Sequence, residues 1–281
     1  MRLASVTIDG KPAYGFLTEE GFVDLVPHLG SKYADLRELL AAQALAEAHE
    51  LLSGARATPL ANVVFDRLIP NLDARMFGLG WSYRDHQIET GKDAPSHPFL
   101  FNKLPQSMVG AGRDLLRPRH STRFDFEGEI VIVIGKPGRH IPPARAMEHV
   151  AGYSIMMDGS VRDWQQHSVT AGKNFDASSA FGPCLVTTDE ITDPSRMELV
   201  TRINGVEMQR SAFGLMAWPI DELIAYVSTF CRLEAGDSIS TGTPGGVGHK
   251  RTPPVFLKSG DEVSVAVSGI GELRNRVVDE R

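Results

Sequence analysis

The sequence predicts an α+β protein whose strands form mixed β-sheets, with a small N-terminal α/β domain ahead of a larger one. Short apolar segments separated by Gly- and Pro-containing turns recur along most of the chain, which is typical of strands. Only a few segments have apolar residues at helical spacing. The strands do not alternate with helices of similar length, and this argues against a doubly wound parallel sheet.

The small domain is expected to cover residues 1–72. Three apolar segments, at 3–8, 14–17 and 22–25, predict short antiparallel strands joined by turns. Ser31 is suited to cap a helix that runs to Leu52, and Gly54 would end it. Because the segment after this helix leads into the rest of the chain, we place the domain boundary near residue 72.

The second domain, residues 73–281, is expected to consist mainly of strands. Strands are predicted at 129–134, 152–157, 184–187, 198–203, 237–241 and 262–267. Helices are predicted at 142–149 and 220–231. Five consecutive β-branched residues, Ile130 to Ile134, indicate a strand that is buried on both faces.

The composition argues against several classes of function. The 281 residues carry a formal charge of -6, which gives no net attraction for nucleic acid. No segment reaches the roughly 18 consecutive apolar residues of a membrane-spanning helix, and the first residues lack the pattern of a secretory signal. The two cysteines, Cys184 and Cys231, lie in apolar stretches without a metal-binding spacing. We therefore expect a cytoplasmic protein that binds neither nucleic acid nor membrane.

Three acids at alternating positions, Asp125, Glu127 and Glu129, lead into the buried strand. A continuous strand would place all three on one face, and Gly128 would let a ligand approach the backbone. Asp158 likewise follows an apolar segment. Carboxylates at the ends of buried strands are costly unless a cation binds them, although a solvated strand end is the alternative interpretation. Oxygen ligands without cysteine favour Mg²⁺ or Mn²⁺ over zinc.

Six motifs, spread over residues 75–275, occur in an order that resembles a known family. They are Tyr83-Arg84-Asp85-His86 with Glu89, Pro98 to Lys103, Glu127-Gly128-Glu129, Asp158 to Gln165, Lys173 to Asp176, and Thr241-Gly242-Thr243-Pro244. In this order they resemble the fumarylacetoacetate hydrolase family. The resemblance implies that family's mixed β-sheet roll with a smaller N-terminal domain, and usually a homodimer. It also implies that Glu127, Glu129 and Asp158 bind Mg²⁺ or Mn²⁺.

The resemblance implies roles for polar residues around this metal site. Lys173 would be catalytic by holding a carboxylate or keto oxygen of the substrate, and Arg162 would offer a planar fork to a carboxylate. The further substrate-binding residues that it implies are Gln165, Thr243 and Lys103. Without the resemblance, a salt bridge of Arg162 with Asp163 or Asp85 is an equal alternative.

His86 and Glu89 are the candidates for acid/base catalysis. A carboxylate three residues from a histidine on one helical turn stabilises the imidazolium, so the histidine can take a proton from water. In the family this region resembles a lid that orders over the substrate. The alternative is a surface helix with an incidental His/Glu pair.

The resemblance favours a metal-dependent hydrolase that cleaves a carbon–carbon bond in a β-diketo acid, such as an acylpyruvate or a fumarylacetoacetate-like compound. Cleavage would proceed through an enolate that the metal stabilises. The same enolate serves an oxaloacetate decarboxylase, keto–enol isomerisation, or a 2-hydroxyhepta-2,4-diene-1,7-dioate isomerase. A hypothesis from another class is a non-catalytic protein that binds a metal and a small acid.

Overall fold

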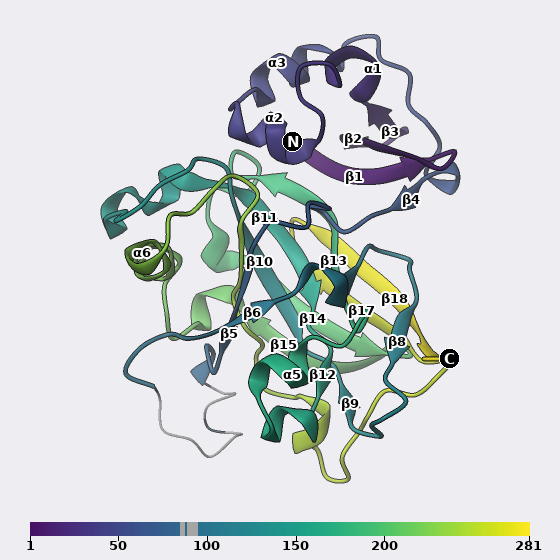
Figure 1. Ribbon diagram of the computed structural model, residues 1–281, viewed down its shortest axis with the longest axis vertical. Helices are drawn as coiled ribbons and strands as arrows, with labels where there is room; N and C mark the ends of the chain where they lie inside the picture. The colour runs from purple at the N-terminus through teal and green to yellow at the C-terminus, as the bar shows by residue number, and fades with distance from the viewer. Residues whose placement is uncertain (85–87, 89–94) are drawn as a thin grey trace.

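The computed structural model describes residues 1–84, 88 and 95–281. In this part of the chain the strands form three sheets, with eleven, five and two strands. Short helices lie around them, so the α+β prediction is confirmed (Figure 1). No helix in the described ranges has the length and apolar content to cross a bilayer.

The N-terminal elements form the purple lobe at the top of Figure 1. Its strands are β1 (Arg2–Ile8), β2 (Lys11–Thr18) and β3 (Gly21–Asp24), which pair in antiparallel order as predicted. Its helices are α1 (Val26–Leu29), α2 (Leu36–Ala41) and α3 (Leu45–Glu50). A 3-10 turn (Leu60–Asn62) and β4 (Val64–Phe65) lead out of the lobe.

The single helix predicted from Ser31 to Leu52 is wrong. Asp35 rather than Ser31 is the N-cap, because its side chain accepts a hydrogen bond of 2.9 Å from the backbone N–H of Glu38. The helix is interrupted after Ala41, and Gln43 has a φ of 54°, a left-handed conformation that an α-helix does not tolerate. The apolar spacing persists across this break, which is why the sequence pattern suggested one helix.

The eleven-stranded sheet continues from the N-terminal lobe into the rest of the molecule. Its order is β3-β2-β1-β13-β11-β10-β16-β5-β6, while β4 pairs with β1 and β7 with β13. The further strands are β5 (Met76–Gly80), β6 (Phe99–Lys103), β7 (Met108–Val109), β10 (Gly128–Ile134), β11 (Val150–Met157), β13 (Ser179–Thr187) and β16 (Ser238–Ser240). Because β1 pairs directly with β13, the lobe shares a sheet with the second domain. The boundary near residue 72 stays a prediction.

A five-stranded sheet packs against the large one. Its order is β15 (Val206–Ala212), β14 (Glu198–Ile203), β17 (Glu262–Val267), β18 (Gly271–Asp279) and β8 (Leu115–Arg117). The third sheet pairs β9 (Phe124–Asp125) with β12 (Ser160–Val161). The strands predicted at 129–134, 152–157, 184–187, 198–203, 237–241 and 262–267 correspond to β10, β11, β13, β14, β16 and β17.

Helices fill the connections between these strands. Helix α5 covers Val169–Lys173, and α6 covers Ile220–Phe230, close to the prediction of 220–231. The helix predicted at 142–149 is a 3-10 helix, Pro143–His149. Other 3-10 turns lie at Pro105–Ser107, Trp164–Gln166, Pro194–Arg196, Phe213–Leu215 and Gly248–Lys250.

Strand β10 is buried on both faces, as its β-branched run predicts. Its three isoleucines belong to a core that includes Leu199 and Val265 of the five-stranded sheet. Its two valines belong to a second core that includes Leu36 and Leu39 of α2. All seven residues of β10 are buried. Burying such a side chain contributes about 1.5–3 kcal/mol, so this strand is a rigid base for the acids at its start.

Candidate metal centre

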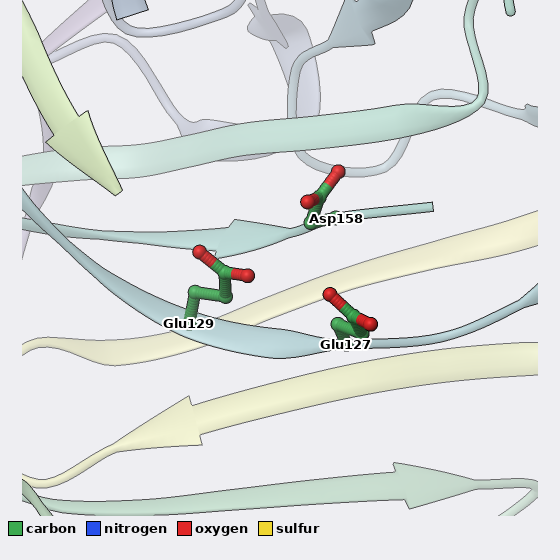
Figure 2. Close-up of side chains that lie close together, drawn as sticks. All are labelled: Glu127, Glu129 and Asp158. Atoms are coloured by element: carbon green, nitrogen blue, oxygen red, sulfur yellow. The ribbon is translucent and has the colours of Figure 1, made fainter. Parts of the chain in front are cut away.

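Glu127, Glu129 and Asp158 come together at one end of the large sheet. Strands β10 and β11 are antiparallel, with Gly128 opposite Met157, so the start of β10 lies beside the end of β11. One oxygen atom from each acid lies within 4.8 Å of the others. Figure 2 shows the two glutamates on one ribbon and Asp158 just beyond the neighbouring strand. All three acids are buried, which makes a solvated strand end the wrong interpretation.

Asp125 does not join this triad, so the prediction of one strand carrying three aligned acids is wrong. The chain leaves β9 at Asp125 and starts β10 only at Gly128. The Asp125 carboxylate instead accepts hydrogen bonds of 2.8 Å and 3.0 Å from the backbone N–H groups of Gly248 and His249. Although burial alone would raise the pKa of Asp125, Arg162 and His249 hold it below its usual value.

The position of Gly128 suggested that a ligand approaches the backbone there, but a neighbouring strand occupies that space. A Cβ atom there would lie 2.1 Å from Oγ1 of Thr201 in β14. The glycine therefore lets the five-stranded sheet approach the backbone between the two glutamates. Its N–H donates to Oε1 of Gln209 at 2.9 Å, a buried contact that no sequence pattern indicated.

Lys173 lies between two members of the triad. Helix α5, capped by Ser168, ends at this lysine, and its Nζ donates to Glu127 and, at 2.7 Å, to Oδ2 of Asp158. Burial alone would lower the pKa of Lys173, but Asp158 and Glu127 outweigh it and raise the pKa. The ammonium group is therefore a fixed positive charge, as expected.

Lys103 contacts the other oxygen of Asp158. Its Nζ lies 2.9 Å from Oδ1 of Asp158 and 2.9 Å from the Ser179 hydroxyl. The side chain is fully buried, and this burial lowers the pKa of Lys103 despite the neighbouring Asp158. It lies behind the acid rather than in the cavity described below.

Arg162 holds two acids with one guanidinium group. Nε lies 2.7 Å from Oδ2 of Asp125, and a terminal nitrogen lies 2.7 Å from Oε1 of Glu127. Burial opposes the charge, but these two carboxylates outweigh it and raise the pKa of Arg162. Asp163 was one of the two partners that the sequence offered for Arg162. It instead accepts a hydrogen bond from the Ser121 hydroxyl. The other proposed partner, Asp85, lies outside the described residues.

Glu129 makes no ion pair within residues 1–84, 88 and 95–281. It accepts hydrogen bonds from the Ser240 hydroxyl and, at 3.0 Å, from the N–H of Gly242. Burial, together with the charges of Asp158 and Glu127, raises the pKa of Glu129 to about 8.

The charges around the triad favour a bound cation. Among the described residues, the three cationic side chains of Lys103, Lys173 and Arg162 contact the buried carboxylates of Asp125, Glu127 and Asp158. Glu129, the fourth buried carboxylate, has no such partner, so a bound cation would take the place of its proton. A cluster of carboxylate oxygens suits a hard divalent cation such as Mg²⁺ or Mn²⁺, so the residues fit the predicted metal.

A cavity of about 380 Å³ opens above Glu127. One wall is apolar and is formed by Leu79, Trp81, Phe99, Phe101 and Val169. The predicted residues Arg162, Gln165, Lys173 and Thr243 lie on its polar side. This volume suits a small organic acid.

Two predicted polar residues are already engaged by the protein. Gln165 accepts a hydrogen bond of 3.1 Å from Arg162. The Thr243 hydroxyl donates to the Gly128 carbonyl at 3.0 Å and accepts from Gln209 at 2.7 Å. Both still face the cavity.

The structure adds His249 and Lys250 to the cavity lining. They lie on a 3-10 turn far along the chain, and no spacing rule linked them to the acids. The predicted acid/base residues, His86 and Glu89, lie outside the described residues.

Comparison with known proteins supports the fold and identifies the family. The family described as fumarylacetoacetate (FAA) hydrolase C-terminal matches residues 75–278. The bovine mitochondrial oxaloacetate tautomerase FAHD2A is 42% identical over 204 residues, which are 71% of this chain and 65% of the relative. The oxaloacetate tautomerase YisK of Bacillus subtilis is 39% identical over 224 residues, covering 78% of this chain and 74% of the relative.

A solved structure extends the similarity to the whole fold. The fumarylacetoacetate hydrolase EaFAH from Exiguobacterium antarcticum has a TM-score of 0.87 and 34% identity, with 100% of both chains covered. The chain therefore belongs to the fumarylacetoacetate hydrolase family.

Proposed function

We propose that the protein is a divalent-metal-dependent enzyme that interconverts the keto and enol forms of oxaloacetate or a closely related 2-oxo dicarboxylic acid. The observation that carries the proposal is the buried carboxylate triad beside a cavity with cationic side chains. Relatives of about 40% identity that are named oxaloacetate tautomerases support this choice over the hydrolase that the motifs favoured.

Each residue of the site has a part in this proposal. Glu127, Glu129 and Asp158 would hold Mg²⁺ or Mn²⁺, which supplies a Lewis acid that stabilises enolate charge. Lys173 lines the cavity and would hold an anionic oxygen of the substrate. Arg162 keeps Glu127 in place and presents its remaining donors to a substrate carboxylate.

Lys103 has a different part from the one implied by the family resemblance. Its burial and its contact with Asp158 support a positioning role rather than contact with substrate. His86 and Glu89 remain the proposed acid/base pair, which would move the proton between the carbon next to the keto group and the solvent.

Hydrolysis of a carbon–carbon bond in an acylpyruvate or fumarylacetoacetate-like acid is the second candidate. The similarity to a solved fumarylacetoacetate hydrolase supports it, as does the His86/Glu89 pair, which hydrolysis needs to activate water. We also propose a homodimer and a cytoplasmic location, which the family resemblance and the sequence suggested.

The test is a panel of reactions with Mg²⁺ or Mn²⁺. The enol–keto conversion of oxaloacetate is followed by ultraviolet absorbance, beside decarboxylation of oxaloacetate and cleavage of acylpyruvates. We expect the conversion to be the fastest reaction, to stop on chelation, and to be lost in Glu129→Gln. Glu148→Gln, an exposed acid of the same type, serves as the control. Faster cleavage of acylpyruvates would favour the second candidate, and turnover of no compound would leave a non-catalytic binding protein.

A further inference from the structure

The proposed function leaves one buried carboxylate, that of Asp125, without a chemical part. The side chain of Asp125 is fully buried. Its oxygens accept hydrogen bonds from the backbone N–H groups of Phe126, Gly248 and His249 at 2.8–3.0 Å, and from Nε of Arg162 at 2.7 Å. Donors of this kind favour the ionised form of a carboxyl group, so Asp125 is a fixed negative charge.

The imidazole ring of His249 lies against this carboxylate. Its Nδ1 atom is 3.2 Å from Oδ2 of Asp125. Because an ionised carboxylate can only accept, Nδ1 carries the proton of the neutral ring, and Nε2 is the nitrogen with a free lone pair. Within the described ranges, Nε2 has no hydrogen-bond partner.

The 3-10 turn Gly248–Lys250 is shaped around Asp125. A Cβ atom at Gly248 would lie 2.5 Å from Oδ1 of Asp125 and 1.9 Å from the Val255 carbonyl oxygen. Only glycine therefore lets the turn approach the carboxylate so closely. Both the backbone N–H and the ring of His249 are then directed at the same oxygen, Oδ2, which fixes the orientation of the ring.

His249 also faces the cavity above Glu127. Its side chain is 27% exposed and lines this cavity together with Lys173 and Glu127. Arg162 connects the two sides, since its Nε contacts the Asp125 oxygen that His249 contacts, and its terminal nitrogen contacts Glu127. A small organic acid that fills the cavity would therefore contact His249 as well as the residues around the triad.

The enol–keto conversion needs two groups that move protons. The O–H bond at the 2-position breaks, and a C–H bond forms at the adjacent carbon, so one group must accept a proton while another supplies one. His86 has the proposed part at the carbon. A proton acceptor for the 2-hydroxyl group is still required.

We propose that His249, oriented by Asp125, is a second catalytic acid/base residue, whose Nε2 accepts the proton of the enol hydroxyl group. This inference rests on the proposed function. As the O–H bond breaks, its electron pair completes the C=O bond. The electrons of the carbon–carbon double bond then form the new C–H bond with the proton that His86 supplies. The imidazolium of His249 is stabilised by Asp125 and returns its proton to water.

The first test compares two replacements of His249 in the enol–keto conversion of oxaloacetate with Mg²⁺. Loss of an acid/base residue typically costs about 10²–10⁴ in rate, so His249→Ala should lower kcat by about 10² with little change in KM. His249→Asn keeps an N–H that can donate to Asp125 but has no basic nitrogen, so it should lose as much.

His28→Ala, at an exposed histidine in α1 that does not line the cavity, is the matched control and should keep full activity. Both His249 variants should still bind one Mn²⁺ per chain in a calorimetric titration, because the triad supplies the ligands of the metal.

Added imidazole should restore part of the rate of His249→Ala, beyond the rate of imidazole alone, because a free base can then enter the vacated space. The same addition should leave the wild type and His28→Ala unchanged. Mg²⁺ is the metal of choice here, since it prefers oxygen ligands to imidazole.

A second test reads the tautomer of His249 without any turnover. Nitrogen NMR of 15N-histidine-labelled protein, with chelator and above pH 8, should show a ring that carries its proton on Nδ1. This signal should be absent in His249→Ala and present in His28→Ala.

The outcomes separate this inference from the proposed function. A wild type that does not convert oxaloacetate would refute the tautomerase and this step together. If the wild type converts oxaloacetate, any of three results would overturn the part of His249 alone: full activity in His249→Asn, no response of His249→Ala to imidazole, or a His249 ring protonated on Nε2.

Discussion

Glu129 differs from the other two acids of the triad because it has no ion pair among the described residues. Its pKa, raised from 4.5 to about 8 by burial and by Asp158 and Glu127, gives the metal site a pH dependence. In protein freed of metal by a chelator, folding favours the protonated form of Glu129, because the pKa of Glu129 is higher in the folded chain than in the unfolded chain. The stability that protonated Glu129 contributes is therefore complete below pH 4.5 and is lost as the pH rises through about 8.

A bound divalent cation should reverse this trend. Because the cation replaces the proton on Glu129, metal affinity should rise about tenfold per pH unit below pH 8. The difference in Tm between metal-loaded and chelated protein should widen over the same range. Thermal scans with Mn²⁺ or with chelator, from pH 5 to pH 9, measure it. Glu129→Gln should abolish the pH dependence, and an unchanged slope in that variant would contradict the assignment.

Lys103 and Lys173 contact the same aspartate but should respond differently to replacement by methionine. Lys173 lines the cavity, so Lys173→Met should lower turnover by about 10²–10³. Lys103 is fully buried behind Asp158, so Lys103→Met should cost about 3 kcal/mol of unfolding free energy, and metal should restore part of it.

Urea unfolding and steady-state kinetics on both lysine variants distinguish these effects. If Lys103→Met left stability intact but raised the KM for oxaloacetate alone, Lys103 would be a substrate contact, as the family resemblance implied.

For single residues, the sequence best predicted those side-chain positions that depend on neighbouring residues in the chain. Glu127 and Glu129 lie on one face because strand alternation acts over two positions. The partners of Arg162 were not predictable, because Asp125 reaches it through the pairing of β9 with β12. Asp125 also contacts His249, 124 positions away, and no periodicity reports a contact of that kind.

At the level of elements, the contact between β10 and β14 controls the spacing of the two sheets. Gly128→Ala would place a methyl group 2.1 Å from Oγ1 of Thr201. Such overpacking typically costs about 1–3 kcal/mol, and here it would also displace the flanking glutamates. We therefore expect lower stability and weaker metal binding in Gly128→Ala.

Thr201→Ala should rescue this variant in part. The Thr201 hydroxyl is buried and has no hydrogen-bond partner among the described residues, so removing it breaks no hydrogen bond with them. Urea unfolding of both single variants and the double variant measures the coupling. If the losses in unfolding free energy of the two single variants simply added in the double variant, the clash would be relieved by movement elsewhere.

The elements that the sequence predicted well are those with a strong local signal. The β-branched run predicted β10, and the apolar stripe predicted α6. The helix break around Gln43 escaped prediction because a left-handed residue leaves the leucine spacing on either side intact. Strands β15 and β18 were missed because some of their buried positions carry polar side chains, Gln209, Ser211 and Asn275, so the apolar residues do not alternate regularly.

At the level of the whole molecule, the N-terminal lobe is part of the core that supports the site. Leu39 of α2 is fully buried in the same cluster as Val131 and Val133 of β10. Since β1 also pairs with β13, we expect the described lobe and the rest of the chain to unfold together.

Leu39→Ala tests this cooperation. It should cost about 2–5 kcal/mol and lower the temperature of one common calorimetric transition. Leu72→Ala, at a leucine that is 69% exposed, should leave the transition unchanged. A separate early transition in Leu39→Ala would show that the lobe unfolds independently of the site.

The most direct measurement is a calorimetric titration of Mn²⁺ into chelator-treated protein near pH 8. The buried triad predicts one ion per chain in the wild type, retained in Glu148→Gln and lost in Asp158→Asn. Absence of binding in the wild type, or equal binding in Asp158→Asn, would contradict a metal centre formed by Glu127, Glu129 and Asp158.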